Sequence, residues 1–164
     1  MKNLIIGFDP GLNNTGWGII ENLSNTEKYI NHGSISTKKD IPLGQRLNTI
    51  YEGVSELFSN YSPESIAVEK IFSNKNPQST LKLGKARAII FLVAARFKVD
   101  IFEYSPNTVK KNLVGYGHAE KMQIIKMIER FFPGLKSLNH DSADALAVAI
   151  CHSMQKKSKI NLFV

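Results

Sequence analysis

Residues 4–9 read LIIGFD, and Pro10 and Gly11 follow them directly. A short apolar run of this kind is typical of a buried β-strand, and a Pro-Gly pair after it indicates a turn. The run ends in the carboxylate of Asp9, which is costly to bury unless it is paired or bound to a cation. The segment therefore predicts a central strand of a sheet with a polar site at its end.

The rest of the chain alternates strand and helix patterns around this segment. Two further strands are expected at 16–20 and 28–36, which together with 4–9 give a three-strand meander. Apolar residues at helical spacing predict helices over 43–58, 80–97, 118–132 and 140–155, and a short helix opening at Pro106. Strands are also expected at 65–69 and 99–104. This order favours an α/β fold whose mixed sheet, a meander plus parallel strands, is flanked by helices.

Length and composition are those of one compact domain. The chain has 164 residues, 43% of them apolar and 21% charged, which is enough for a core of its own. We expect a single domain over 1–155 and a short basic and apolar tail over 156–164. The longest apolar run, 88–95, is far below the ~20 residues that cross a bilayer, so a cytoplasmic location is expected. The single cysteine, Cys151, lies in an apolar helical pattern and is interpreted as structural.

Four acids are candidates for metal ligands. Asp9 and Glu69 each end an apolar strand, and Asp141 and Asp144 stand i, i+3 near a helix start, so both project from one face. If the four converge, their oxygens suit Mg²⁺ or Mn²⁺. Two such ions about 4 Å apart activate water and stabilise the leaving oxygen of a phosphodiester. Any one acid can instead be a surface charge, and Asp141, which follows Asn139 closely, can instead cap its helix.

Several motifs, in order along the chain, resemble the RuvC family of Holliday-junction resolvases. They are GFDPG at 7–11 with TGWG at 15–18, AVE at 67–69, LKLGKAR at 81–87 and DSADALA at 141–147, and the resemblance covers about residues 4–153. By motif position, Asp9, Glu69, Asp141 and Asp144 would be the catalytic, metal-binding acids. Some relatives carry histidine where Asp141 stands. His140 is interpreted as a solvated helix-start residue, although at i, i+4 from Asp144 it is also placed to orient that carboxylate.

The resemblance also implies the fold, the reaction and the partners. The fold is expected to be ribonuclease H-like. The protein would be a homodimeric, magnesium-dependent endonuclease that makes paired symmetric nicks in opposing strands of a four-way DNA junction, in recombination and repair. Each site would hold two ions, and branch-migration proteins of the same pathway are possible partners. The twofold symmetry of a junction with two equivalent strands to cut suits a C₂ dimer.

The formal net charge of +7 favours a polyanionic partner, although many basic domains bind no nucleic acid. An exposed Phe72 beside Glu69 would stack on an unpaired base, where the family places a wedging phenylalanine; packing into the core is the alternative. The candidates for DNA contact are Phe72, Lys75, Asn76, Lys82, Lys85, Lys110 and Lys121. Of these, Lys110 and Lys121 match basic family positions, whereas a charge run is also typical of a merely solvated face.

Other interpretations remain open. A non-cleaving junction-binding protein would share the fold, but the presence of all four acids argues against it. An actin-like kinase or ATPase also places an acid, glycines and a small hydroxyl residue after a first strand, but it needs two lobes, for which this chain is short. A relative acting on RNA is a third alternative. The small residues Gly84, Ala86 and Ala88 suit a dimer interface and packing within the chain equally well. Lysines 156, 157 and 159 match no motif.

Overall fold

The computed structural model describes residues 3–24, 26–71, 77–135 and 138–161, with side chains described up to residue 158. Its elements, in chain order, are β1 (Leu4–Asp9), β2 (Asn14–Asn22), β3 (Glu27–Ser36), α1 (Leu43–Tyr61), β4 (Ser65–Glu69), α2 (Pro77–Phe97), β5 (Asp100–Tyr104), α3 (Pro106–Val114), α4 (Lys121–Phe131) and α5 (His140–Asn161). Among the described residues, no helix is long and apolar enough to cross a membrane.

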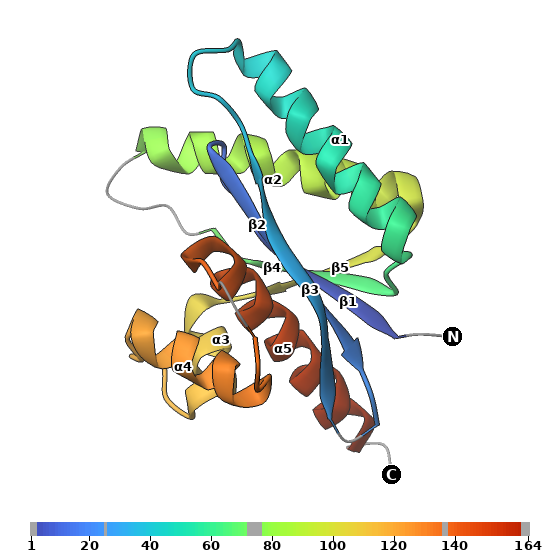
Figure 1. The fold of residues 1–164 in the computed structure, drawn as a ribbon, viewed down its shortest axis with the longest axis vertical. Helices are drawn as coiled ribbons and strands as arrows, with labels where there is room; N and C mark the ends of the chain where they lie inside the picture. Colours follow the sequence, from blue (N-terminus) through green and yellow to red (C-terminus); the bar gives the residue numbers. More distant parts are fainter. Residues whose placement is uncertain (1–2, 25, 72–76, 136–137, 162–164) are drawn as a thin grey trace.

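The five strands form one mixed sheet in the order β3-β2-β1-β4-β5. The first three strands pair antiparallel, as a meander. β4 pairs parallel with β1, and β5 pairs parallel with β4. Figure 1 shows α1 and α2 together on one side of the sheet, and α3, α4 and α5 on the other. The predicted architecture of a meander plus parallel strands, flanked by helices, is confirmed.

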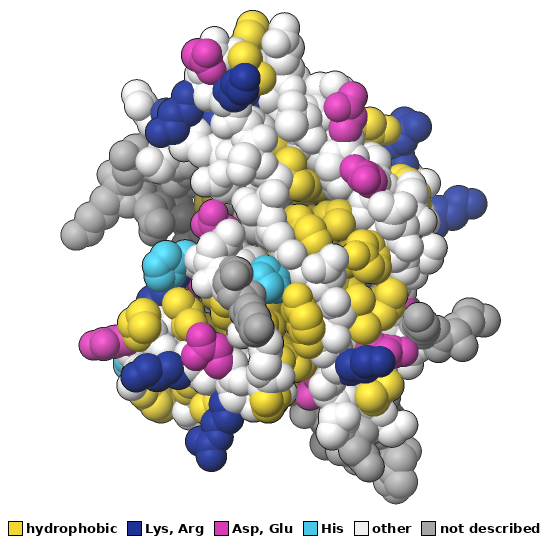
Figure 2. Space-filling view, in the orientation of Figure 1, with side chains coloured by type: hydrophobic (Ala, Val, Ile, Leu, Met, Phe, Trp, Pro, Cys, Tyr) yellow, Lys and Arg dark blue, Asp and Glu magenta, His cyan; other side chains and the backbone are white. Residues whose placement is uncertain are grey.

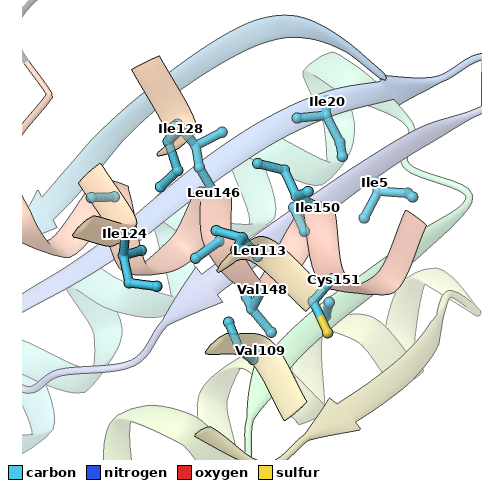
Figure 3. Packing of buried hydrophobic residues seen from close by; sticks show 14 of the residues in the cluster. Ile5, Ile20, Val109, Leu113, Ile124, Ile128, Leu146, Val148, Ile150 and Cys151 are labelled. Carbon is cyan, nitrogen blue, oxygen red and sulfur yellow. The ribbon is translucent and has the colours of Figure 1, made fainter. Parts of the chain in front are cut away.

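Each face of the sheet carries its own apolar core, because side chains of a strand alternate between the two faces. On β1, Ile6 and Phe8 pack with residues of α1 and α2. Ile5 points to the opposite face, where it belongs to a cluster with Leu146 and Ile150 of α5. Figure 3 shows this second cluster, to which α3 and α4 also contribute. Both faces of the sheet are therefore covered, and β1 is buried along most of its length.

Cys151 lies in the α5 cluster and is fully buried. Burial raises the pKa of its thiol to about 12, so the thiol stays protonated at neutral pH and is not a nucleophile. The interpretation of Cys151 as a structural residue agrees with this placement.

Several predicted helix boundaries differ from the structure by a few residues. The first helix, expected to end at residue 58, continues to Tyr61, and the second, expected to begin at residue 80, begins at Pro77. The helix expected to begin at His118 begins at Lys121, because Glu120 is its N-cap and forms a capping box with Gln123. The last helix, expected to end at Gln155, continues to Asn161. Its extension carries Lys156, whose ammonium lies 2.6 Å from a carboxylate oxygen of Glu64.

Two glycines allow α5 to lie unusually close to the sheet. A Cβ atom at Gly7 would stand 1.9 Å from the carbonyl oxygen of Ala145, and one at Gly16 would stand 2.2 Å from that of Asp141. Both positions would clash with helix backbone, which cannot move aside as a flexible side chain does. The absence of side chains at these points on β1 and β2 therefore sets the depth at which α5, and the acids at its start, are held.

We expect Gly16→Ala to push the start of α5 away from the sheet and to lower the free energy of unfolding by about 1–3 kcal/mol or more, as overpacking does. The matched control is Gly44→Ala in the first turn of α1, where a Cβ meets nothing within 4 Å. That change should leave stability unchanged or raise it by roughly 0.5–1 kcal/mol, since alanine favours helix. Urea unfolding of both variants measures the difference. Equal stability of the two variants would contradict the assigned role of Gly16.

Candidate functional site

Asp9 and Glu69 stand side by side at one edge of the sheet. The parallel register pairs Phe8 of β1 with Val68 of β4, so the next residue of each strand is one of the two acids. Strand alternation directs both toward the face that α5 covers, since Phe8 and Val68 belong to the core on the other face. Each of the two predicted strands ends in its acid, and this register brings the two strand ends together.

Asp141 and Asp144 lie in the first turns of α5, beside the same edge. Gly16, which pairs with Asp9 across β1 and β2, lies directly under the backbone of Asp141. The side chain of Asn139 caps the helix, because its Oδ1 accepts hydrogen bonds from the backbone N–H of Ser142, at 2.8 Å, and from its hydroxyl, at 2.6 Å. The alternative of Asp141 as the cap is therefore wrong, and its carboxylate is left for another role.

The pKa of Asp9 reflects the closeness of the other three acids. Burial raises the pKa of Asp9 to about 7, and the charges of Asp144, Asp141 and Glu69 add to the increase. The pKa of Glu69 is also raised, by the surrounding protein and then by Asp144, although solvent reaches this carboxylate. The neighbouring acids thus disfavour ionisation of Asp9 and Glu69, as clustered carboxylates do. The four predicted residues are brought to one place.

Two lysines lie within the electrostatic reach of the acids. The Nζ of Lys121 donates a 2.9 Å hydrogen bond to Oδ2 of Asp144. Burial lowers the pKa of Lys121, but this bond and the charges of Asp144, Asp9 and Asp141 outweigh it, so the pKa is raised. Lys110 lies on α3, and its positive charge opposes the increase in the pKa of Glu69. Both lysines therefore stand where a phosphate approaching the acids would meet them.

The carboxylates converge without forming a closed metal cage. Among the residues that the structure describes, no three His, Cys, Asp or Glu side chains are arranged to hold a metal ion as they stand. One of the four carboxylates, that of Asp144, is instead paired with the ammonium of Lys121. The donor set is nevertheless four oxygen ligands of like charge, which is what Mg²⁺ and Mn²⁺ take in proteins. The residues present therefore fit a hard divalent cation.

A cavity of about 340 Å³ opens beside the two strand-end acids. Its lining includes both Asp9 and Glu69, and it extends over Pro106 of α3 to Ser79 and Leu83 in the first turns of α2. A volume of this size is typical of a site for a small ligand or a portion of a chain such as a nucleotide. The acids therefore face a space that a substrate group can enter.

The remaining predicted site residues fall into two groups. Phe72, Lys75 and Asn76 lie outside the described residues. Lys82 and Lys85 are exposed on the first half of α2, as phosphate contacts need to be. Their exposure agrees equally with a solvated face.

Two alternatives for other residues are settled by contacts. Thr15, which an actin-like phosphate loop would need at its surface, is fully buried and donates a 2.8 Å hydrogen bond to the carbonyl of Gly11. His140 is exposed at the start of α5, and the hydrogen-bond partner of the Asp144 carboxylate among the described residues is Lys121. The interpretation of His140 as a solvated helix-start residue agrees with this arrangement.

A buried polar network that the sequence did not reveal fastens α5 to the sheet. His152 of α5 is buried, with Nε2 at 3.0 Å from the hydroxyl of Ser65 and Nδ1 at 2.7 Å from that of Tyr104. These partners lie on β4 and β5, so the helix that carries Asp141 and Asp144 is tied to two parallel strands. A single histidine in an apolar helical pattern gives no signal of its partners, which are 87 and 48 residues away in the chain.

Comparisons with known proteins agree on one family. A family model described as crossover junction endodeoxyribonuclease RuvC matches residues 5–152. The RuvC of Bartonella bacilliformis is 45% identical over 155 residues, covering 94% of this chain and 93% of the relative. That of Sinorhizobium medicae is 46% identical over 154 residues, covering 94% and 92%. The resemblance inferred from the motifs is confirmed.

Solved structures agree with this family. The structure of Thermus thermophilus RuvC is 27% identical, with a TM-score of 0.87 over 95% of this chain and 96% of that chain. A second structure of that protein, in complex with a Holliday junction substrate, is 28% identical with a TM-score of 0.88 and the same coverage. The mixed sheet is thus of the ribonuclease H-like type that the resemblance implied. The chain belongs to the RuvC family of crossover junction endodeoxyribonucleases.

Proposed function

We propose that this protein is a metal-dependent endonuclease that resolves four-way DNA junctions by symmetric nicks in two opposing strands. Membership of the RuvC family supports the endonuclease activity, and the related structure with a Holliday junction supports the substrate. The observation that carries the proposal is the convergence of four acids at the ends of β1 and β4 and the start of α5. Branch-migration proteins of the same pathway are proposed as further partners.

The acids Asp9, Glu69, Asp141 and Asp144 would hold Mg²⁺, or Mn²⁺ in its place, with two ions per site. Held by these acids, such ions would supply an activated water and would stabilise the leaving oxygen of the scissile phosphodiester. The fold keeps the four carboxylates together despite their repulsion. It does so through the close packing of α5 on β1 and β2 and through the register of β1 with β4.

The lysines beside the acids position the substrate. A phosphodiester is an anion, and four carboxylates alone would repel it. Lys121 and Lys110 offset this repulsion, because their ammonium groups act on the acids from α4 and α3. Lys121 can exchange its carboxylate partner, Asp144, for a phosphate oxygen when DNA enters.

The proposal predicts that Asp9→Asn binds a junction but does not cut it. Binding depends on basic side chains, whereas cutting needs a charged metal ligand. Nicking of a synthetic mobile junction in Mg²⁺ should fall by more than the about 10–100-fold that loss of an outer-shell partner costs. The assay reads symmetric nicked duplexes on a denaturing gel, and a mobility shift in EDTA reads binding.

The matched control for that assay is Asp100→Asn, which removes an exposed acid at the opposite end of the sheet. It should cut at the wild-type rate. Undiminished nicking by Asp9→Asn would refute the assigned site, and wild-type protein that cuts structured RNA in preference to the DNA junction would refute the assigned substrate.

A second prediction concerns the stability of the metal-free protein. The pKa of Asp9 is near 7 in the folded state against an ordinary value of 3.8, so between these pH values the folded state holds a proton that the unfolded state lacks. Stability from this group is therefore greatest below pH 4 and is lost as the pH rises to 7. Asp9→Asn should be more stable than wild type at pH 8 in EDTA, by roughly 1–4 kcal/mol, with no advantage at pH 4.

Urea unfolding at the two pH values measures this difference, with Asp100→Asn as the control that shows none. Addition of Mg²⁺ at pH 8 should stabilise the wild type more than Asp9→Asn, because only the wild type has the full set of carboxylates for the ion to neutralise. Lower stability of Asp9→Asn than of wild type at pH 8 would contradict the described repulsion.

We also propose that the protein is a homodimer that pairs through α2. Leu81 and Leu92 are exposed by 66% and 51% on this helix, and they recur at helical spacing with Gly84 and Ala88. A Cβ at Gly84 would meet nothing within 4 Å, so packing within the chain does not require a glycine there. An apolar stripe with an open small residue suits close approach of a second copy of the same helix.

Leu92→Asp should therefore convert a dimer into a monomer, since it places a charge within a contact that would otherwise be apolar. Light scattering after gel filtration measures the mass, and circular dichroism checks that the fold is kept. The control is Leu23→Asp, which changes a leucine that is 42% exposed in the β2–β3 turn. A wild-type monomer, or a dimeric Leu92→Asp variant, would contradict this assignment.

A further inference from the structure

A second cavity, of about 500 Å³, lies next to the acidic one. We call it the basic groove and define it by its lining, which is Leu12, Asn13, Lys39, Arg46, Ser79, Lys82 and Leu83. These residues come from the β1–β2 turn, the segment after β3, the first turn of α1 and the start of α2. Figure 2 shows Lys and Arg side chains over the loop between β3 and α1, in the same region of the molecule, with an acidic side chain beside them that does not line the groove.

The charge of the basic groove is all of one sign. Lys39, Arg46 and Lys82 line it, and no acid does. None of the three forms an ion pair with any carboxylate in the described part of the chain. Three uncompensated cations around one hollow repel each other unless an anion lies between them. The groove therefore has the electrostatic character of an anion site.

Arg46 is held in place before any ligand binds. Its Nε donates to the hydroxyl of Thr37 at 3.0 Å, and its Nη2 donates to the carbonyl of Leu12 at 3.0 Å and to Oδ1 of Asn13 at 2.6 Å. These bonds use three of the five guanidinium N–H groups. Both N–H groups of Nη1 are without a partner among the described residues, so a fixed guanidinium offers two donors toward a ligand.

The basic groove and the acidic cavity share a wall. Ser79 and Leu83, at the start of α2, line both of them, and Asn13 and Asp9 stand at the two sides of the tight turn between β1 and β2. A chain of phosphates that passes over Asp9 and Glu69 therefore continues naturally into the groove. An isolated anion would be attracted by the three cations alone. A nucleic acid strand would in addition span both cavities, because they share a wall.

We propose that the basic groove binds a backbone phosphate of the junction arm beside the scissile phosphate, and that Arg46, Lys39 and Lys82 are its contacts. This subsite deepens the proposed function, on which it rests. The four acids repel DNA, so the subsite would add affinity for the strand next to them. It would also fix the position of the strand to be cut along the site.

The test removes the two lysines and leaves the arginine, because Arg46 also ties the turn to α1 and its loss would mix folding with binding. Lys39→Gln/Lys82→Gln should lower the slope of log Kd against log salt concentration by about 2, about 1 for each lysine. The matched control, Lys28→Gln/Lys98→Gln, removes two exposed lysines at the opposite end of the sheet. It lowers the net charge equally and should leave the slope unchanged.

A second measurement locates the phosphate. Single phosphates along an arm of the junction are replaced by neutral methylphosphonates, and binding is measured without metal. At one or two neighbouring positions the wild type should lose affinity by about threefold or more, while the double variant, which keeps only Arg46 of the three contacts, should lose clearly less. At all other positions the two proteins should respond alike.

The outcomes separate this subsite from the proposed function. A salt slope equal for the double variant and its control, or a uniform response along the arm, overturns the subsite even when wild type cuts junctions. Conversely, position-specific coupling supports the subsite even when no nicking is seen, in which case the catalytic proposal alone fails. Circular dichroism and thermal melting confirm that both double variants are folded.

Discussion

The close contact of α5 with β1 and β2 is the constraint on which the rest of the structure depends. Gly7 and Gly16 leave no side chain between helix backbone and strand backbone, and the buried His152 ties the far part of the same helix to β4 and β5. The helix is thus fixed in depth and in direction along the sheet. Because Asp9 and Glu69 end strands on that face, this packing is also what brings Asp141 and Asp144 to them.

The contact has an electrostatic cost. Burial and three neighbouring acids raise the pKa of Asp9 to about 7, which means that the fold holds the carboxylate where ionisation is unfavourable. Packing forces keep the acids together, and the one ion pair that the described residues form within the group, from Lys121 to Asp144, compensates only part of their charge. Instability of this kind is usual at functional sites, where binding of a counter-charge recovers the lost free energy.

The sequence predicts the strands and the acids well, but it predicts helix caps and long-range hydrogen-bond partners poorly. Apolar runs that end in Asp9 and Glu69 are local signals, so residue patterns mark the two strands and their acids, but that the strand ends lie side by side follows only from the parallel pairing of β1 with β4. The predicted start of α4 is wrong because the capping box at Glu120 competes with the apolar pattern before it. Asn139 rather than Asp141 caps α5, and only geometry distinguishes two nearby polar candidates. In sequence Arg46 resembles any charge on a solvated helix, because its partners Leu12 and Asn13 are more than 30 residues away.

The two adjoining cavities differ in charge. Asp9 and Glu69 line one of them, and Lys39, Arg46 and Lys82 line the other. The four acids alone would repel a polyanion and would accept a phosphate only with bound cations, whereas the basic groove attracts phosphate without them, so the proposed cutting and binding call for separate groups of side chains. The start of α2 forms the wall between the two, through Ser79 and Leu83, and the outer stripe of the same helix is the surface proposed to meet a second copy. If both proposals hold, one helix stands between the strand to be cut, the groove that would hold its continuation and the second copy, and the spacing of two active sites on a junction would follow from how two such helices pack.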